Sequence, residues 1–358
     1  VYQGGYRNGV AYFAFSLGLR RIVAATTDFV NYSYPSLPKQ PAFTSGDGLG
    51  AGADGDLYFA GPESGSIQFW RGGKYVERSM TVPDDASDAH RFFVAISTLS
   101  PGGTLDPPLR PDADALDAAA LEWRVYPIGD ATGDAWIASH YGRAFVAGAD
   151  AHFKEIAEPS FPFVVLGRTD DGRLWGATPR RRTNRGSALL TSPSRLMVSR
   201  DGVHWSLAAD LPGDPGAVGL HGGVPWVALT AFEGDASGVE VVRLDGGAMR
   251  AAPTGAVYAG EDMFFADTSG GWFLVCGGEP GTRDDDASGP LVAHALDSAR
   301  LFSFDASGRN VYLTDRLEPM RTSGAGAPSA ILSASANALA SLGSAFEPTI
   351  VSNEPADV

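Results

Sequence analysis

Hydrophobic and polar residues alternate along short stretches of this chain, and each stretch ends in a turn. The pattern is clearest in residues 171–212, where Gly172 precedes an apolar stretch that contains Trp175. A second apolar stretch, 196–198, leads through a polar turn into a third, which Trp205 opens. Because side chains alternate between the two faces of a strand, such stretches predict short antiparallel strands joined by tight turns.

One pattern recurs along the whole chain: a glycine is followed by an aromatic residue three positions later and by a small residue five positions later. Glycine permits the positive φ of a tight hairpin, and the two later positions then share one face of a strand. The aromatic side chain fills the space between neighbouring sheets, and the small residue suits the narrow part of a wedge. The six aromatic residues are Tyr12, Tyr58, Trp136, Trp175, Trp226 and Phe273.

Each copy of the pattern belongs to one four-stranded unit of about 40 to 50 residues. Six such units predict an all-β, six-bladed β-propeller of four-stranded antiparallel blades, folded as a single domain over residues 1–358. Two alternatives stay open. One is a β-sandwich with coincidental spacing, and the other is a seven-bladed ring with a degenerate C-terminal blade in residues 329–352.

Closure of the ring is predicted from the two ends of the chain. The first glycine of the pattern comes so early that we expect no inner strand before it in the first blade. Residues 329–335 (SAILSAS) have the composition of a strand. We therefore predict that this C-terminal strand pairs with the N-terminal blade and closes the ring, which leaves no free edge strand.

Composition excludes some classes of protein. The formal net charge is −15 at pH 7, which disfavours nucleic acid as a partner because phosphate binding requires a basic face. No apolar stretch approaches the roughly 20 residues that a membrane-spanning helix needs. The one cysteine, Cys276, lies in an apolar run and can form no disulfide within the chain.

Three insertions interrupt the regular spacing, at residues 100–120, 178–195 and 279–290, and we expect them to form loops that carry binding functions. The second insertion holds five arginines, Arg180, Arg181, Arg182, Arg185 and Arg195. Guanidinium groups bind carboxylates and phosphates bidentately, so this insertion is a candidate site for an anionic partner. The alternative is that it docks against acidic loops of this chain or of a neighbouring subunit.

The third insertion is acidic and is the only candidate cation site. Asp284, Asp285 and Asp286 offer oxygen ligands to Ca²⁺, although they lack the ligand spacing of a dedicated calcium loop. The six histidines of the chain are scattered without metal-ligand spacing. We therefore expect no other metal and no cofactor.

The turn at residues 199–205, Ser-Arg-Asp-Gly-Val-His-Trp, resembles the Asp-box of sialidase-like (BNR-repeat) β-propellers, and residues 26–32 look like a degenerate second copy. In that family the box closes the hairpin between the third and fourth strands of a blade. Its aspartate accepts hydrogen bonds from turn amides, and its aromatic residue plugs the blade. The resemblance thus implies structural roles for Ser199, Asp201, Gly202, Trp205, Asp28 and Tyr32.

The catalytic residues of sialidases are matched only in part. Tyr6 and Arg7 keep two residues of the N-terminal Tyr/Phe-Arg-Ile-Pro motif of that family. Arg7, Arg168 and Arg243 are candidates for its carboxylate-binding arginine clamp, but no spacing selects them. The place where the resemblance implies an acid/base aspartate, residues 17–19, has no carboxylate.

The sequence therefore favours a non-catalytic binding or assembly module that presents propeller loops to a glycan or protein partner. We expect such a module at a cell surface, in a secreted complex or in a virion, and a cytoplasmic location stays open. The alternative is a secreted glycoside hydrolase or polysaccharide lyase with its active site on the propeller axis. The oligomeric state does not follow from the sequence.

Overall fold

The fold is seen in a computed structural model. It describes residues 3–17, 20–35, 48–51, 56–61, 65–71, 74–86, 123–157, 159, 163–178, 181–185, 188–192, 194–211, 213–231, 238–245, 248–251, 263–276, 291–297, 301–304 and 311–314. Within these residues every regular element is a β-strand, and no helix there could span a membrane.

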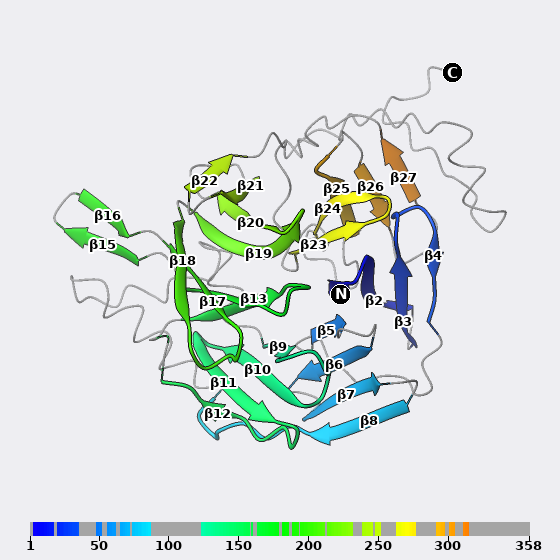
Figure 1. The fold of residues 1–358 in the computed structure, drawn as a ribbon, viewed down its shortest axis with the longest axis horizontal. Helices are drawn as coiled ribbons and strands as arrows, with labels where there is room; N and C mark the ends of the chain where they lie inside the picture. The colour runs from blue at the N-terminus through cyan, green and yellow to red at the C-terminus, as the bar shows by residue number, and fades with distance from the viewer. Residues whose placement is uncertain are drawn as a thin grey trace, which may run out of the picture.

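The strands form six antiparallel sheets arranged in a ring, which are the blades of a β-propeller (Figure 1). Blades 1 to 3 follow the chain in order, with the innermost strand first. Blade 1 consists of β1 (Gln3–Arg7), β2 (Val10–Leu17), β3 (Arg20–Thr26) and β4 (Tyr32–Ser33). Blade 2 consists of β5 (Gly48–Ala51), β6 (Leu57–Gly61), β7 (Ser66–Arg71) and β8 (Lys74–Ser79). Blade 3 consists of β9 (Arg124–Pro127), β10 (Ala135–His140), β11 (Arg143–Gly148) and β12 (Lys154–Glu155).

Blades 4 to 6 complete the ring. Blade 4 consists of β13 (Val164–Arg168), β14 (Leu174–Thr178), β17 (Ser194–Ser199) and β18 (Ser206–Leu211). A separate two-stranded sheet, β15 (Arg181–Arg185) and β16 (Ala188–Ser192), is inserted between its second and third strands. Blade 5 consists of β19 (Asp214–His221), β20 (Val224–Ala231), β21 (Gly238–Asp245) and β22 (Ala248–Ala251). Blade 6 consists of β23 (Met263–Thr268), β24 (Gly271–Cys276), β25 (Leu291–Ala295), β26 (Leu301–Phe304) and β27 (Val311–Thr314).

The predicted all-β, six-bladed propeller is confirmed, and the β-sandwich alternative is wrong. The last blade differs from the prediction because it has five strands. The third and outer strands expected at residues 301–304 and 311–314 are present, but β25 lies between β24 and β26 and pairs with both. The pair β26 and β27 is thereby displaced one position outward.

The ring closes through its inner strands. They contact one another in the order β1, β5, β9, β13, β19 and β23, and β23 contacts β1 again. The expectation that blade 1 lacks its own inner strand is wrong, because β1 pairs with β2 along its whole length. The predicted closing strand at 329–335 and the seventh blade proposed for 329–352 lie outside the described residues.

Six hydrophobic clusters make up the core, and each lies between two neighbouring blades. Between blades 1 and 2, for example, Val23 packs with Phe59. The sixth cluster lies between the last blade and the first, where Phe13 and Phe29 pack with Phe273. The rings of Phe29 and Phe273 lie 4.6 Å apart between centroids. Each blade therefore buries both of its faces against neighbours, and the core is a circle of interfaces.

All six aromatic residues of the repeated pattern lie on second strands, but one of them faces the opposite way. Tyr58, for example, belongs to the cluster toward the following blade, whereas Trp136 belongs to the cluster toward the preceding blade. Their ring centroids lie 5.3 Å apart. A change of register by one residue would exchange the two faces of a strand. The connection before β10 does not account for the reversal, since Gly172 precedes β14 as Gly133 precedes β10, and Trp175 keeps the common orientation.

Most of these aromatic residues pair with a glycine on the inner strand of the same blade. The pairs are Tyr12 with Gly5, Tyr58 with Gly50, Trp175 with Gly167 and Trp226 with Gly219. Of these glycines, Gly50 leaves room for the paired ring itself, whereas a Cβ at Gly219 would meet Phe265 of the next blade. At Gly50 this room is fully used, because a Cβ atom there would lie 2.1 Å from Cζ of Tyr58.

We predict that Gly50→Ala lowers the free energy of unfolding by about 1–3 kcal/mol, because overpacking a buried site forces side chains out of place. Tyr58 cannot move freely, since its hydroxyl donates a hydrogen bond of 3.1 Å to the carbonyl of Val125 in blade 3. Urea denaturation measures the change. Gly167→Ala is the matched control, because its Cβ would have no atom within 4 Å. Equal losses in the two variants would contradict the clash as the cause.

A second prediction concerns His294, which is buried on β25 with no hydrogen-bond partner for either ring nitrogen among the described residues. Burial lowers the pKa of His294 to about 4. The unfolded chain binds this proton at a pKa of about 6.5, so the free energy of unfolding should fall as the pH falls from about 6.5 to about 4.

His294→Leu should flatten that part of the stability profile, measured by urea denaturation at a series of pH values. His152→Leu, at an exposed position, is the control for replacing a histidine by leucine. A profile that is equally steep with and without His294 would show that this residue does not cause the acid sensitivity.

Candidate functional site

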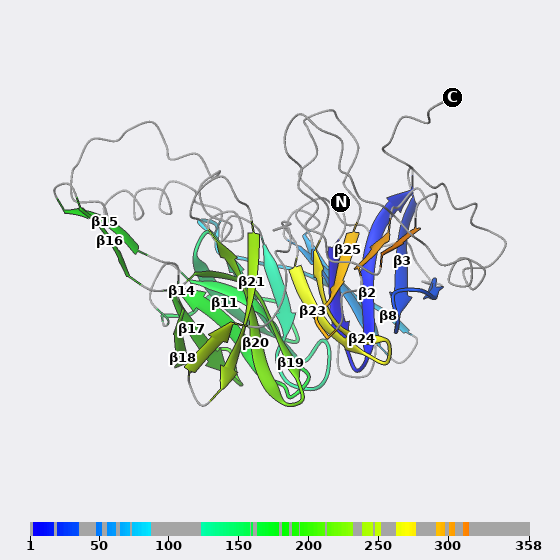
Figure 2. The same ribbon diagram turned by 90° about the horizontal axis from the view of Figure 1, so that it is seen from above.

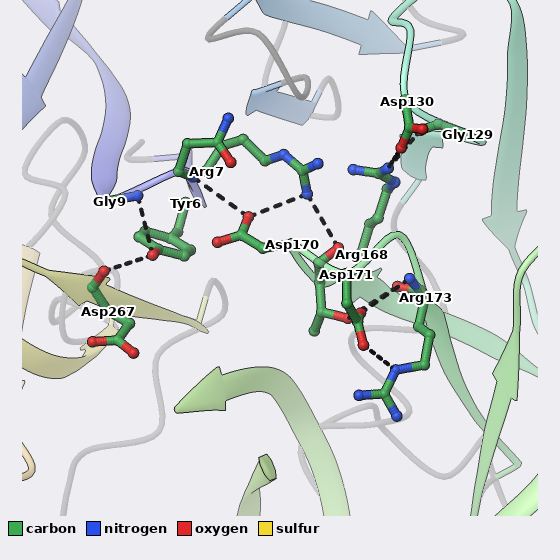
Figure 3. A network of polar contacts seen from close by, with 12 residues as sticks. Tyr6, Arg7, Gly9, Gly129, Asp130, Arg168, Asp170, Asp171, Arg173 and Asp267 are labelled. Atoms are coloured by element: carbon green, nitrogen blue, oxygen red, sulfur yellow. Dashed lines mark hydrogen bonds and ion pairs between the residues drawn. The ribbon is translucent and has the colours of Figure 1, made fainter. Parts of the chain in front are cut away.

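Four of the six inner strands bring polar side chains to one end of the propeller axis. Tyr6 and Arg7 end β1, Arg168 ends β13, His221 ends β19, and Asp267 lies near the end of β23. Each of these strands turns back into the second strand of its blade at this end, so the side chains meet across the axis. Figure 3 shows the contacts that Tyr6, Arg7 and Arg168 make there.

Arg7 joins two blades that lie opposite each other in the ring. Its Nη1 atom donates to the carbonyl of Thr169 and lies 3.1 Å from Oδ1 of Asp170, both in blade 4. The backbone amide of Asn8 also faces this carboxylate oxygen, at 3.4 Å. The side chain of Arg7 is only 5% exposed, whereas that of Asp170 is 32% exposed. The ion pair therefore spans the axis and holds blade 1 against blade 4.

Arg168 lies next to Arg7, and the two guanidinium groups point toward each other (Figure 3). Its Nη2 atom donates to the carbonyl of Gly129 at 2.5 Å and lies 3.4 Å from Oδ1 of Asp130. Burial lowers the pKa of Arg168, and the nearby positive charge of Arg7 lowers it further. Both effects mean that the site disfavours a second positive charge.

The charges at this end of the axis are unevenly balanced. Asp130, the carboxylate next to Arg168, is 95% exposed, so water screens it. Asp170 is therefore the less exposed of the two carboxylates that lie close to the buried guanidinium groups. The Nε atoms of Arg7 and Arg168 are buried and have no hydrogen-bond partner among the described residues. Such an arrangement can bind a small anion such as a carboxylate.

Tyr6 extends the polar contacts toward blades 5 and 6. Its hydroxyl donates to the carbonyl of Asp267 at 2.6 Å and accepts from the amide of Gly9 at 3.1 Å. Burial and the charge of Asp170 raise the pKa of Tyr6 to about 12, so the phenol stays protonated. The carboxylate of Asp267 lies 3.0 Å from Nδ1 of His221, which orients this imidazole.

The imidazole of His221 is also fixed by stacking. Its ring lies on the indole of Trp272, with 4.7 Å between the centroids. The side chain of His221 is 44% exposed, so part of the ring faces solvent. A histidine held in this way by a carboxylate and an aromatic ring has the orientation that a proton acceptor needs.

These contacts form one network. Arg168 of blade 4 contacts blade 3, and Arg7 of blade 1 contacts blade 4. Tyr6 of blade 1 then contacts Asp267 of blade 6, which contacts His221 of blade 5. Tyr58 adds blade 2 by its hydrogen bond to blade 3. The site therefore ties the ring together and at the same time offers groups for binding an anion and a proton.

The turn at residues 199–205 joins β17 to β18, the third and fourth strands of blade 4. The hydroxyl of Ser199 accepts from the amide of Gly202 at 2.9 Å. Oδ1 of Asp201 accepts from the amides of Val203 and His204, and Oδ2 lies 2.7 Å from Nδ1 of His204. These hydrogen bonds hold the pKa of Asp201 well below its usual range, and the one from the His204 side chain has the largest effect. The side chain of Trp205 closes the turn by donating to the carbonyl of Gly202.

The turn at residues 26–32 has the same contacts in blade 1. Thr26 takes the place of Ser199, Asp28 that of Asp201, and Tyr32 that of the tryptophan. Phe29 stands at the glycine position with a positive φ of 57°, where Gly202 has 74°. This strained backbone is held by the burial of the Phe29 ring. The aspartates of both turns are bound by the backbone, which gives them a structural role.

The arginine insertion is a hairpin rather than a loop. β15 and β16 pair over five residues, from Arg181 with Ser192 to Arg185 with Ala188, and project from blade 4 (Figures 1 and 2). Arg195 lies in β17 at its base, where it forms an ion pair of 3.8 Å with Asp210 of the neighbouring strand. The side chains of both are well exposed, so this pair contributes little to stability.

Several predicted positions lie outside the described residues. They are Arg180, the insertions 100–120 and 279–290, and the candidate calcium ligands Asp284, Asp285 and Asp286. Within the part of the chain that the structure describes, no three histidine, cysteine or acidic side chains lie close enough to hold a metal ion.

The sequence indicated only part of the axial site. Of the three arginines considered as a clamp, Arg7 and Arg168 meet at the axis, whereas Arg243 lies over the ring of Trp226 in blade 5. His221 and Asp267 were not predicted. Both lie at or near the end of an inner strand, and this position is the one feature of the sequence from which they could have been predicted.

Comparisons with known proteins do not identify the chain. No protein-family model matches the sequence, and no curated protein matches it. Solved structures that align with this chain include virginiamycin B lyase from Staphylococcus aureus, with 10% identity, coverage of 88% of this chain and 84% of that chain, and a TM-score of 0.39. A streptogramin B lyase gives 11% identity, coverage of 88% and 83%, and a TM-score of 0.42. Regucalcin from Agrobacterium tumefaciens, a calcium-binding protein, gives 14% identity, coverage of 80% and 84%, and a TM-score of 0.36.

We predict that Arg7→Gln lowers the free energy of unfolding by about 1–3 kcal/mol, since it removes a buried partner from the Thr169 carbonyl and from Asp170. A double-mutant cycle with Asp170→Asn should give a coupling energy of about 0.5–1 kcal/mol, because Asp170 is partly exposed. The cycle of Arg71→Gln with Asp134→Asn is the control, since that ion pair is 46% and 64% exposed. Equal coupling in the two cycles would contradict a special role for the axial pair.

Proposed function

We propose that this protein is a non-catalytic binding or assembly module, and that the hairpin β15–β16 binds a carboxylate-rich glycan or protein. One observation carries the proposal: the insertion richest in arginine forms a hairpin that projects from the ring instead of folding onto its own blade (Figure 1). We use the name arginine arm for residues 179–195.

The charge of the arm supports this role. Its 17 residues contain five arginines and no aspartate or glutamate, although the whole chain carries a net charge of −15. An isolated two-stranded hairpin is only marginally stable in water and leaves both edges open. Docking on an acidic partner would supply further contacts to the hairpin.

The arrangement at the axis also supports a binding role. The carboxylate of Asp170 already occupies the place beside Arg7 that an anionic substrate would take in an axial active site. The side chains of Arg7 and Arg168 are each only 5% exposed, so a large substrate could reach them only after a rearrangement. We propose a surface, secreted or particle-associated location, where glycans and protein partners of this kind occur.

A specific observation favours a second candidate function. His221, oriented by Asp267, lies in the same network as Arg7 and Arg168. An arginine pair for a carboxylate and an oriented histidine for a proton are the groups that a hydrolase or lyase acting on acidic polysaccharides requires. In that case Asp170 would be displaced by the substrate.

The arm is tested with Arg181→Ala, Arg182→Ala and Arg185→Ala in one triple variant. Binding to immobilised hyaluronan and to poly-glutamate should weaken at least tenfold, because three charge-assisted contacts are lost. The matched control replaces the exposed Arg71, Arg78 and Arg200 by alanine, which changes the net charge equally but leaves the arm intact. The two probes separate a glycan partner from a protein partner.

Unchanged affinity in the arm variant, or an equal loss in the control, would overturn the role of the arm. The same polysaccharide should be recovered intact after incubation with the wild-type protein. Release of new reducing ends or of unsaturated uronates would replace the binding function by the second candidate.

A further inference from the structure

The two faces of the ring are built from different connections. In every blade the turn from the inner to the second strand, and the turn from the third to the fourth strand, lie on the same face, because the strands are antiparallel. We call this the turn face. The arginine arm joins β14 to β17, the second and third strands of blade 4, and therefore leaves from the opposite face (Figure 2).

The turn face is acidic. Its described connecting residues hold nine aspartates but only two arginines, Arg173 and Arg200. The aspartates are Asp28, Asp56, Asp130, Asp134, Asp150, Asp170, Asp171, Asp201 and Asp297. One of the two arginines, Arg173, is already paired with Asp171. The turns of this face thus leave a clear excess of negative charge toward solvent.

The acidic residues are concentrated on two blades. Six of the nine aspartates lie in the turns of blades 3 and 4, and blade 4 also carries the arm. The side chains of Asp130, Asp134 and Asp201 are 95%, 64% and 53% exposed. Asp130 pairs with Arg168, Asp134 with Arg71, and Asp201 contacts His204, so the guanidinium groups of a second molecule would share these exposed carboxylates with partners in their own chain.

The rest of the chain has the charge that the arm requires in a partner. Without the five arginines of the arm, the remaining 22 basic and 42 acidic residues give a net charge of −20. A second copy of the chain therefore presents an acidic surface of known geometry to the arm. In a head-to-tail stack of two rings, the face from which the arm leaves lies against the turn face of the next copy.

We propose that copies of this chain dock head to tail, with the arginine arm of one copy bound to the turn face of the next. The inference rests on the proposed function, since it names the partner of the arm. The interface is heterologous, because the surface that binds differs from the surface that is bound. Such contacts repeat from copy to copy and extend into a linear assembly unless the rotation between copies closes a ring.

The test uses two variants that each destroy one half of the interface. The arm variant carries Arg181→Glu, Arg182→Glu and Arg185→Glu, and the face variant carries Asp130→Asn and Asp134→Asn. Sedimentation velocity at low salt should show the wild-type protein as oligomers that grow with concentration and dissociate with added salt. Each variant alone should sediment as a monomer, with thermal unfolding showing that it is folded.

The mixture of the two variants gives the sharpest result. The face variant keeps an intact arm, and the arm variant keeps an intact turn face, so an equal mixture should form dimers and nothing larger. Oligomers of the arm variant alone, or a mixture that stays monomeric, would overturn the head-to-tail contact.

A wild-type protein that remains monomeric at low salt also overturns this inference. If its arm still binds poly-glutamate or hyaluronan, the proposed binding function survives and the partner is another molecule. If the arm binds neither a second copy nor these probes, the proposed function fails as well.

Discussion

Every blade of this protein has two apolar faces, and both must be covered by neighbours. The six hydrophobic clusters lie between blades, so a single sheet has no core of its own. Closure between the last blade and the first is therefore required for the stability of all the others. Phe29 and Phe273 pack across this closing interface, and the amide of Gly270 donates to the carbonyl of Thr27 beside them.

The polar network at the axis adds contacts that the hydrophobic interfaces cannot supply. Clusters between blades join only neighbours, whereas the Arg7–Asp170 ion pair joins blades that lie opposite each other. A buried charged group is stabilised only where its partners are in place, so these contacts favour one arrangement of six blades. The guanidinium groups of Arg7 and Arg168 could also bind an anion, and an anion bound there would replace contacts that hold the blades together.

Function, as we propose it, depends on surfaces outside this rigid centre. The turn face and the arginine arm carry charges of opposite sign and lie on opposite sides of the ring. The turns that hold Asp28 and Asp201 fix these carboxylates through backbone hydrogen bonds and keep them ionised. Structural turns thereby also set the charge of the face, without any residue being dedicated to binding.

The sequence by itself determined many of the strands, the six repeats and the turn chemistry, because these depend on alternation with period two and on residues only a few positions apart. It did not reveal the inner strands β1, β5 and β9, the extra strand β25, the reversed face of Trp136, or the hairpin in the arginine insertion. Nor could it bring together Arg7 and Thr169, which are 162 positions apart in the chain. Only the tertiary structure decided these features, because register and ring closure set which side chains meet at the axis.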